Sequence, residues 1–307
     1  MGFFYVRLLS VPQIRIEAPA KLNLHLSIGG KRPDGFHEID SLFLALSFGD
    51  TLLIENNPLF PDSVPEIIME WQANNEIPLE KNIIYKAVTL FRIHAGYADG
   101  LKITVKKRIP PGGGLGGGSS DAAAVLLALN ILASPGGGKI ENGGLLEKSV
   151  LCEMGAVLGS DVPFFLSGLP AALVRGRGEI IQPSVLPETI RNSVFLLVNP
   201  GFSSDTAEAY RLLDNFRETG TAAKAADNSS WPYTNDFLPV FEACNNNGKI
   251  FRQIIDKLYT LGACFAGLSG SGSTCFGIFP NRDKIKTARE TIAGQWPVII
   301  ETFPLAH

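Results

Sequence analysis

The chain has 307 residues, of which 45% are hydrophobic and 19% are charged, with a net charge of −3. This balance is typical of a globular protein with a sizeable core and argues against disorder. There is no run of five like charges, so nucleic acid and an anionic membrane surface are not expected as partners.

The four cysteines are scattered and form no C-x-x-C pair. This usage indicates a reduced cytoplasmic protein rather than a disulfide scaffold. Arg7 and Pro12 interrupt the apolar N-terminus, so we expect no signal peptide, and no apolar stretch is long enough to predict a membrane span.

The first third of the chain predicts strands and one helix before a glycine-rich segment. Alternating or apolar segments of strand length lie at 13–17, 22–28, 42–48, 51–55 and 101–108. Residues 82–95 carry apolar side chains at helical spacing. A helix is expected over 121–132, with Ser119 or Ser120 as its N-cap.

Six of the seven residues from Gly112 to Gly118 are glycines, and they lie between that last strand and that helix. Such a backbone can turn several N–H groups toward one anion, and the following helix start adds a partial positive charge. A flexible linker is the alternative interpretation. The position of the glycine run between a strand and a capped helix favours a phosphate-binding loop. The Walker and protein-kinase motifs are absent, and the spacing of Gly112, Gly114 and Gly117 is only a weak dinucleotide signal.

Strands are expected again at 171–174 and 194–198, and helices at 206–215 and 248–261. We therefore predict an α+β protein with a boundary near residue 168, giving domains 1–168 and 169–307. Two polar, glycine- or alanine-rich stretches, 135–144 and 217–231, are interpreted as surface insertions.

Three segments resemble the superfamily of galactokinase, homoserine kinase, mevalonate kinase and phosphomevalonate kinase (GHMP kinases): 18–24 (APAKLNL), 110–120 (PPGGGLGGGSS) and 267–274 (GLSGSGST). Within it, three more segments resemble the 4-diphosphocytidyl-2-C-methyl-D-erythritol kinases: 32–38 (RPDGFHE), 159–165 (GSDVPFF) and 204–210 (SDTAEAY). The likeness spans about 15–280, with all segments in the order of the family.

The resemblance implies a two-domain GHMP-kinase fold with its active site in the inter-domain cleft. It implies transfer of the γ-phosphoryl group of ATP, with Mg²⁺, to the 2-hydroxyl of 4-diphosphocytidyl-2-C-methyl-D-erythritol, in the non-mevalonate route to isoprenoid precursors. Its catalytic pair falls on Lys21 and Asp161. A carboxylate that accepts the hydroxyl proton, beside a lysine that offsets phosphate charge, suits phosphoryl transfer.

The same resemblance assigns the remaining site residues. The positions for ATP and its phosphates are Asn82, Lys106, Pro110, Pro111, Gly112, Gly113, Gly114, Leu115, Gly116, Gly117, Gly118, Ser119 and Ser120. Lys107, beside Lys106, resembles an adenine-side position too. Ser119 is assigned to Mg²⁺ through the nucleotide. The acceptor positions are Asn23, Phe36, His37, Tyr210, Gly270 and Ser271, with Phe36 and Tyr210 on the two faces of cytosine and His37 at its edge.

Two positions depart from the family pattern: Phe36 stands where tyrosine is usual, and Ser160 stands where alanine is usual. Three alternatives stay open: a related kinase acting on mevalonate or homoserine, a catalytically silent nucleotide-binding protein, and a dinucleotide oxidoreductase. We expect a monomer or a weak homodimer.

Overall fold

The computed structural model describes residues 6–8, 13–57, 63–70, 77–134, 146–219 and 234–305. The predicted insertion at 135–144 lies outside these residues. Of the insertion predicted at 217–231, only 217–219 are described, and they end a helix.

Two long antiparallel strands, β2 (Gln13–Lys31) and β3 (His37–Asn57), form the backbone of the first sheet. The sequence predicts each of them as two shorter strands. The pairing register shifts in β2 between Pro19 and Lys21 and again between Asn23 and His25. At the first shift β3 carries two additional residues, and at the second β2 carries one. The buried side chains of β2 change core at both places, since Ala18 and Leu26 belong to one hydrophobic cluster and Ala20 and Leu24 to the other.

Five more strands complete this seven-stranded sheet: β1 (Val6–Leu8), β4 (Glu66–Glu70), β5 (Gly100–Lys106), β6 (Ala171–Gly176) and β7 (Ile180–Pro183). One half of β3 pairs with β5 and the other half with β6, both antiparallel. β4 lies parallel to β5.

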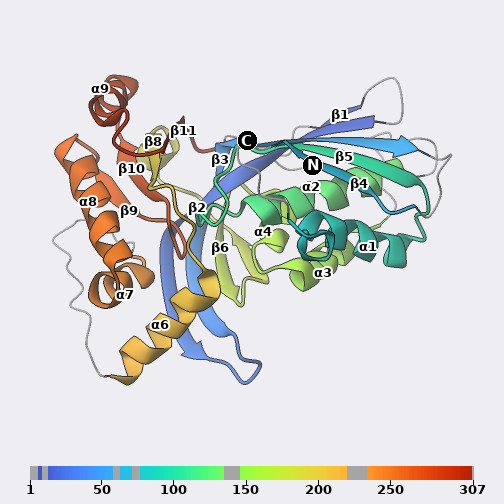
Figure 1. Cartoon of the computed structure of the whole chain (residues 1–307), viewed down its shortest axis with the longest axis horizontal. Helices are drawn as coiled ribbons and strands as arrows, with labels where there is room; N and C mark the ends of the chain where they lie inside the picture. Colours follow the sequence, from blue (N-terminus) through green and yellow to red (C-terminus); the bar gives the residue numbers. More distant parts are fainter. Residues whose placement is uncertain are drawn as a thin grey trace.

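Helices cover one face of this sheet (Figure 1). They are η1 (Leu79–Lys81), α1 (Ile83–Ala95), α2 (Gly117–Leu132), α3 (Lys148–Leu158) and α4 (Val162–Ser167). Helix α2 is central and is buried on nearly every side, because its alanines allow β2, α1 and α4 to approach closely. The glycine-rich loop enters this helix, so the loop is anchored to the core.

A second, four-stranded antiparallel sheet has the order β11-β8-β10-β9. Its strands are β8 (Val194–Asn199), β9 (Phe265–Leu268), β10 (Cys275–Phe279) and β11 (Val298–Thr302). The helices of this part are α5 (Glu188–Arg191), α6 (Thr206–Glu218), α7 (Phe237–Cys244), α8 (Asn246–Thr260) and α9 (Arg282–Ile292). Helices α8 and α9 pack on this sheet, whereas α6 reaches toward the β2–β3 hairpin (Figure 1).

The two sheets share a hydrophobic core. Leu22 and Leu44 of the long strands pack with Phe195 and Phe276 of the second sheet. The mixed arrangement confirms the predicted α+β class. The predicted boundary near residue 168 does not coincide with the change of sheet, because β6 and β7 still belong to the first sheet and the change falls between β7 and β8. We propose that change of sheet as the boundary.

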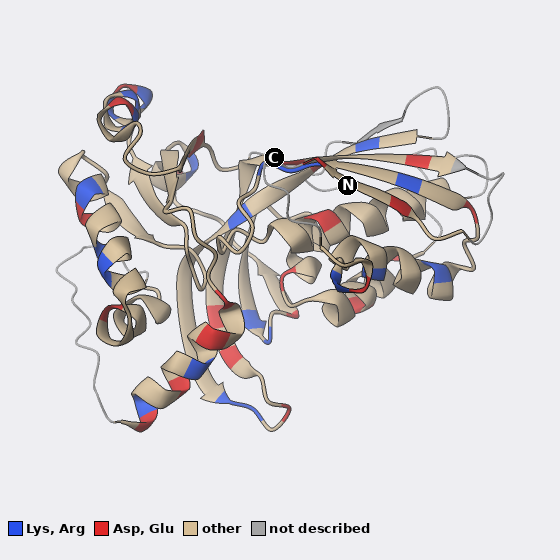
Figure 2. Cartoon of the chain, in the orientation of Figure 1, with Lys and Arg blue, Asp and Glu red and all other residues tan. Residues whose placement is uncertain are grey.

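Residues of both charge signs are interspersed along the chain in Figure 2, including α6 and the β2–β3 hairpin. Among the helices of the described ranges, none combines the length and apolar character needed to cross a membrane.

Candidate active site

A cavity of about 1020 Å³ lies where the helical face of the first sheet meets α6 and the second glycine segment. Its size is at the upper end of the range for ligand pockets and suits a nucleotide-sized molecule with a second ligand. Most of the residues assigned from sequence line it: Lys21, Asn23, Phe36, His37, Asn82, Pro110, Pro111, Gly112–Gly114, Leu115, Gly116–Gly118, Ser119, Asp161, Tyr210, Gly270 and Ser271.

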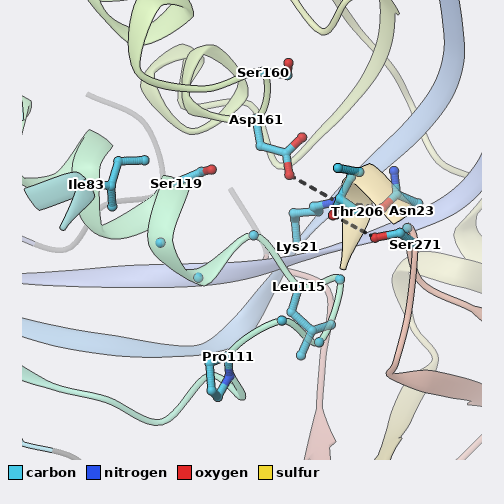
Figure 3. A pocket seen from close by; sticks show the side chains of 18 of the residues that line it. Lys21, Asn23, Ile83, Pro111, Leu115, Ser119, Ser160, Asp161, Thr206 and Ser271 are labelled. Carbon is cyan, nitrogen blue, oxygen red and sulfur yellow. Dashed lines mark hydrogen bonds and ion pairs between the residues drawn. The ribbon is translucent and has the colours of Figure 1, made fainter. Parts of the chain in front are cut away.

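Lys21 and Asp161 face each other across this cavity (Figure 3). The Lys21 Nζ atom lies 3.3 Å from Asp161 Oδ2 and donates a 2.6 Å hydrogen bond to Asn23 Oδ1. It also lies 4.6 Å from the centroid of the Phe43 ring. The Lys21 side chain is only 5% exposed, so its ammonium group keeps one direction and is directed at the carboxylate.

Local structure holds both groups in place. Lys21 and Asn23 lie between the first two register shifts of β2, and they are directed away from the core that Leu22 shares with the second sheet. Asp161 is the N-cap residue of α4, whose apolar residues are all buried. The carboxylate therefore rests on a rigid element and remains 29% exposed toward the cavity.

The glycine-rich loop lines the same cavity. Helix α2 begins at Gly117, with Gly116 as N-cap at φ +70°, so the predicted caps Ser119 and Ser120 are wrong and both serines lie within the first turn. A glycine cap leaves the first N–H groups without a side-chain acceptor, which makes them available to an anion. Ser119 lines the cavity, whereas Ser120 is buried and does not.

The second glycine segment packs directly on this loop. Ser269 Oγ donates to Gly114 O at 2.9 Å, and Thr274 N donates to Gly113 O at 3.1 Å. A Cβ atom on Gly114 would lie only 2.2 Å from Ser269 O, so nothing larger than glycine fits there. Thr206 and Ser271 are joined by a 3.0 Å hydrogen bond on this side of the cavity (Figure 3).

A buried charge cluster supports the loop from behind. Lys107 Nζ donates to Asp50 and, at 2.6 Å, to Asp121 in the first turns of α2. Burial raises the pKa of Asp121 to about 7, with Lys107 opposing the rise and Asp50 adding to it. Although burial alone would lower it, the two carboxylates raise the pKa of Lys107.

Of the two lysines that resemble adenine-side positions, only one lines the cavity. Lys106, at the end of β5, is exposed and lies outside the lining, whereas Lys107 is part of it. Adjacent strand residues face opposite sides, so only one of the two can point inward. Asn82 lines the cavity and also caps α1, with Oδ1 accepting from Ile84 N at 2.9 Å.

The acceptor-side residues gather around α6. The rings of His37 and Tyr210 stack with centroids 4.8 Å apart and planes 20° apart. Burial, with a smaller contribution from nearby Asp161, raises the pKa of Tyr210 to about 12, so its hydroxyl stays protonated. Phe36 is half exposed, and its ring is covered by the Arg177 guanidinium at 5.0 Å rather than by Tyr210.

The charged residues of the lining that were not expected from the sequence include Lys31, Arg177 and Asp214. Asp214 lies 2.6 Å from His37 across a long separation in sequence. No motif marks it, and only its position one helical turn after Tyr210 could have suggested it.

Comparison with known proteins agrees with this geometry. The profile of the GHMP kinases N terminal domain matches residues 82–169, and that of the GHMP kinases C terminal domain matches residues 212–298. Homoserine kinase from Cytophaga hutchinsonii, 16% identical, shares the fold with a TM-score of 0.62 over 96% of this chain and 94% of that one. Fold and loop thus place the chain in the class of the GHMP kinases.

Two proteins named 4-diphosphocytidyl-2-C-methyl-D-erythritol kinase, from Thermodesulfovibrio yellowstonii and Prochlorococcus marinus strain MIT 9301, are each 34% identical to it. The matches cover 93% and 92% of this chain and 96% and 90% of those proteins. A crystal structure of 4-(cytidine 5'-diphospho)-2C-methyl-D-erythritol kinase is 31% identical, with a TM-score of 0.70 over 94% of this chain and 98% of that one. The chain belongs to the family of 4-diphosphocytidyl-2-C-methyl-D-erythritol kinases.

Proposed function

We propose that this protein transfers the γ-phosphoryl group of ATP to the 2-hydroxyl of 4-diphosphocytidyl-2-C-methyl-D-erythritol, in the non-mevalonate route to isoprenoid precursors. The observation that carries the proposal is the Lys21–Asp161 pair, 3.3 Å apart, beside a glycine loop that opens a helix. The membership of the protein in the family of 4-diphosphocytidyl-2-C-methyl-D-erythritol kinases supports the choice of acceptor.

Asp161 acts as the general base in this proposal. Its carboxylate accepts the proton of the attacking hydroxyl while the new O–P bond forms and the bond from the γ-phosphorus to ADP breaks. Lys21 stabilises the charge on the transferring group and holds the carboxylate in position. No covalent phospho-enzyme is needed.

The glycine loop holds the polyphosphate through backbone N–H groups at the start of α2. The donors near it suit Mg²⁺ bound chiefly through the nucleotide, because the Ser119 hydroxyl and the Asp161 carboxylate both line the cavity. In the described part of the chain no cluster of three or more His, Cys, Asp or Glu side chains could hold a metal by itself. Bound there, the ion would offset the negative charge of the phosphates.

The two ends of the cavity would receive different ligands. Asn82 and Lys107 would contact the adenosine end, whereas Lys106 lies outside the lining. Asn23, Phe36, His37, Tyr210, Gly270 and Ser271 would bind the cytidylyl acceptor. A flat pyrimidine stacking on an aromatic ring gains about 1–3 kcal/mol, as bases do on aromatic side chains.

The test is phosphate transfer from labelled ATP to a panel of acceptors, with each product identified by mass. We expect a singly phosphorylated 4-diphosphocytidyl-2-C-methyl-D-erythritol and no product with mevalonate or homoserine. A product with either of those would instead assign a related kinase. No ATP consumption with any acceptor would assign a silent nucleotide-binding protein.

The protein is also proposed to act in the cytoplasm on small molecules alone, as a monomer or weak homodimer. Light scattering coupled to size-exclusion chromatography, over a range of protein concentrations, measures the oligomeric state.

A further inference from the structure

A carboxylate from α6 fixes the orientation of His37 at the edge of the cavity. His37 Nε2 lies 2.6 Å from Asp214 Oδ1, and Lys31 Nζ lies 3.4 Å from the other oxygen of the same carboxylate. The imidazole is 5% exposed and stacks on Tyr210, one helical turn before Asp214. Position and plane of the ring are therefore both set by α6.

This contact also sets where the imidazole carries its proton. Burial alone would raise the pKa of Asp214, but the bonds with His37 and Lys31 lower it, so the carboxylate is ionised and can only accept. Nε2 must then donate its N–H. In the neutral ring Nδ1 keeps a free lone pair, and the partner of one ring nitrogen thereby decides the role of the other.

Nδ1 is available to a ligand. His37 lines the cavity, and within the described ranges no hydrogen bond is made to Nδ1. A planar base joined edge to edge with the imidazole would continue in its plane. It would then extend over the same face of Tyr210 that already stacks on His37.

We propose that Asp214 is a specificity-determining positioning residue, which makes His37 Nδ1 an acceptor and so selects an amino-bearing pyrimidine over a keto-bearing one. This inference rests on the proposed function. Cytosine presents an amino donor at the position where uracil presents a carbonyl acceptor. Nδ1 with a free lone pair pairs with the first and repels the second.

The arrangement around Asp214 allows the preference for cytosine over uracil to be reversed. In Asp214→Asn the Lys31 ammonium can only donate, so it draws the amide oxygen toward itself and turns the amide NH₂ toward His37 Nε2. Nε2 must then accept, the proton moves to Nδ1, and Nδ1 becomes a donor that matches uracil. Asp214→Asn/Lys31→Met removes this orienting group and should restore part of the original preference.

The experiment has two readouts. Long-range ¹H–¹⁵N NMR of the free protein reports which ring nitrogen of His37 bears hydrogen, and only four histidines need assignment, with His37→Ala as reference. Kinetics then compare the cytidylyl acceptor with its uridylyl analogue at saturating ATP. Glu218→Gln, which removes one exposed charge from the same helix, is the matched control.

We expect hydrogen on Nε2 in the wild type, with a preference for the cytidylyl acceptor of about 100-fold in kcat/KM. In Asp214→Asn we expect hydrogen on Nδ1 and a preference reduced at least about ten-fold, through the KM of the acceptor, with kcat and the KM of ATP unchanged. Glu218→Gln should match the wild type in both readouts.

Hydrogen on Nδ1, or on both nitrogens, in the wild type at the assay pH would overturn the proposal. An unchanged tautomer or an unchanged preference in Asp214→Asn would also overturn it. If the wild type phosphorylates neither acceptor, the proposed function fails, whereas the NMR result still stands as a separate test of how Asp214 acts on His37.

Discussion

At the scale of single residues, the site depends on a lysine and an aspartate that the fold directs at each other. Lys21 is buried in the middle of β2, and Asp161 begins α4. Neither residue is unusual in its own segment. Their 3.3 Å separation, with Asn23 as a second partner of the lysine, is the geometry on which the proposed catalytic role rests.

Asp161→Asn tests the base. The amide keeps the shape of the carboxylate but cannot accept the hydroxyl proton, so kcat should fall by about 10²–10⁴. The affinity for ATP should change little. Steady-state kinetics and calorimetry measure the two effects, with Asp256→Asn, an exposed acid on α8, as control. Near-native turnover in Asp161→Asn would exclude this role.

Asp121 leads to a prediction about pH and stability. Its pKa of about 7 in the folded state lies above the ordinary value of about 4, so between these values the folded protein binds more protons than the unfolded chain. Stability from this group is therefore greatest at low pH and is lost as pH rises through about 7. The change cannot exceed about 1.4 kcal/mol per pH unit for one group.

Asp121→Asn removes this titration while keeping an acceptor for Lys107. The free energy of unfolding of the wild type, minus that of the variant, should fall between pH 5 and pH 8 in urea titrations. Asp256→Asn, on the exposed face of α8, should give a difference that varies far less. A constant difference for Asp121→Asn would show that its carboxyl does not titrate in this range.

At the scale of elements, the start of α2 brings the glycine-rich loop next to Lys21, the lysine of the proposed catalytic pair. Gly116 caps the helix at φ +70°, and a Cβ atom there would lie 3.0 Å from Lys21 Cγ and 3.0 Å from Phe165 Cζ. The same residue thus turns the backbone toward a ligand and leaves room for Lys21. Only glycine meets both demands without strain.

Gly116→Val should weaken ATP binding. A β-branched residue at positive φ costs about 1–3 kcal/mol, which corresponds to about a 5- to 150-fold loss of affinity if the loop moves to relieve it. Calorimetry measures the affinity, and circular dichroism checks the fold. Gly30→Val is the matched control, because a Cβ atom at Gly30 meets nothing within 4 Å. Unchanged ATP affinity in Gly116→Val would contradict a phosphate-binding role of the loop.

At the scale of the whole molecule, the two sheets form one structural unit. The core that contains Leu22 and Leu44 of the first sheet also contains Phe195 and Ile278 of the second. The chain end adds a further link, since Leu305 N donates to Ala45 O at 2.9 Å. The walls of the cavity are thereby held in a fixed relation.

Ile278→Ala tests this unity. Ile278 is 1% exposed, so truncation should cost about 2–5 kcal/mol in one cooperative urea transition. Ile93→Ala, at a site 73% exposed, should change stability by less than about 0.5 kcal/mol. Two separate transitions, with only one affected by Ile278→Ala, would show that the sheets unfold independently.

The family and the fold class could be predicted from local sequence patterns, and so could the candidate site around the glycine-rich loop. A glycine run between an alternating strand and an alanine-rich segment predicts an anion-binding loop without any knowledge of the fold. This is possible because glycine conformations and helix starts are local properties. The same holds for the helices predicted at 82–95 and 206–215, which the structure confirms as α1 and α6.

Which polar groups contact one another could not be predicted from the sequence and is seen only in the folded chain. The register shifts between β2 and β3 change which core the side chains around Lys21 join, and a pattern of period two cannot show such a change. The ion pair of Lys107 with Asp50 and the hydrogen bond of His37 with Asp214 join residues far apart in sequence. The strength of these contacts depends on the burial of the groups and on the orientation of their polar atoms. Neither property can be seen in one segment of the sequence. The family resemblance predicted Lys21, Asp161 and the loop. The folded chain added Asp214 to the lining and, of the predicted Lys106 and Lys107, includes only Lys107.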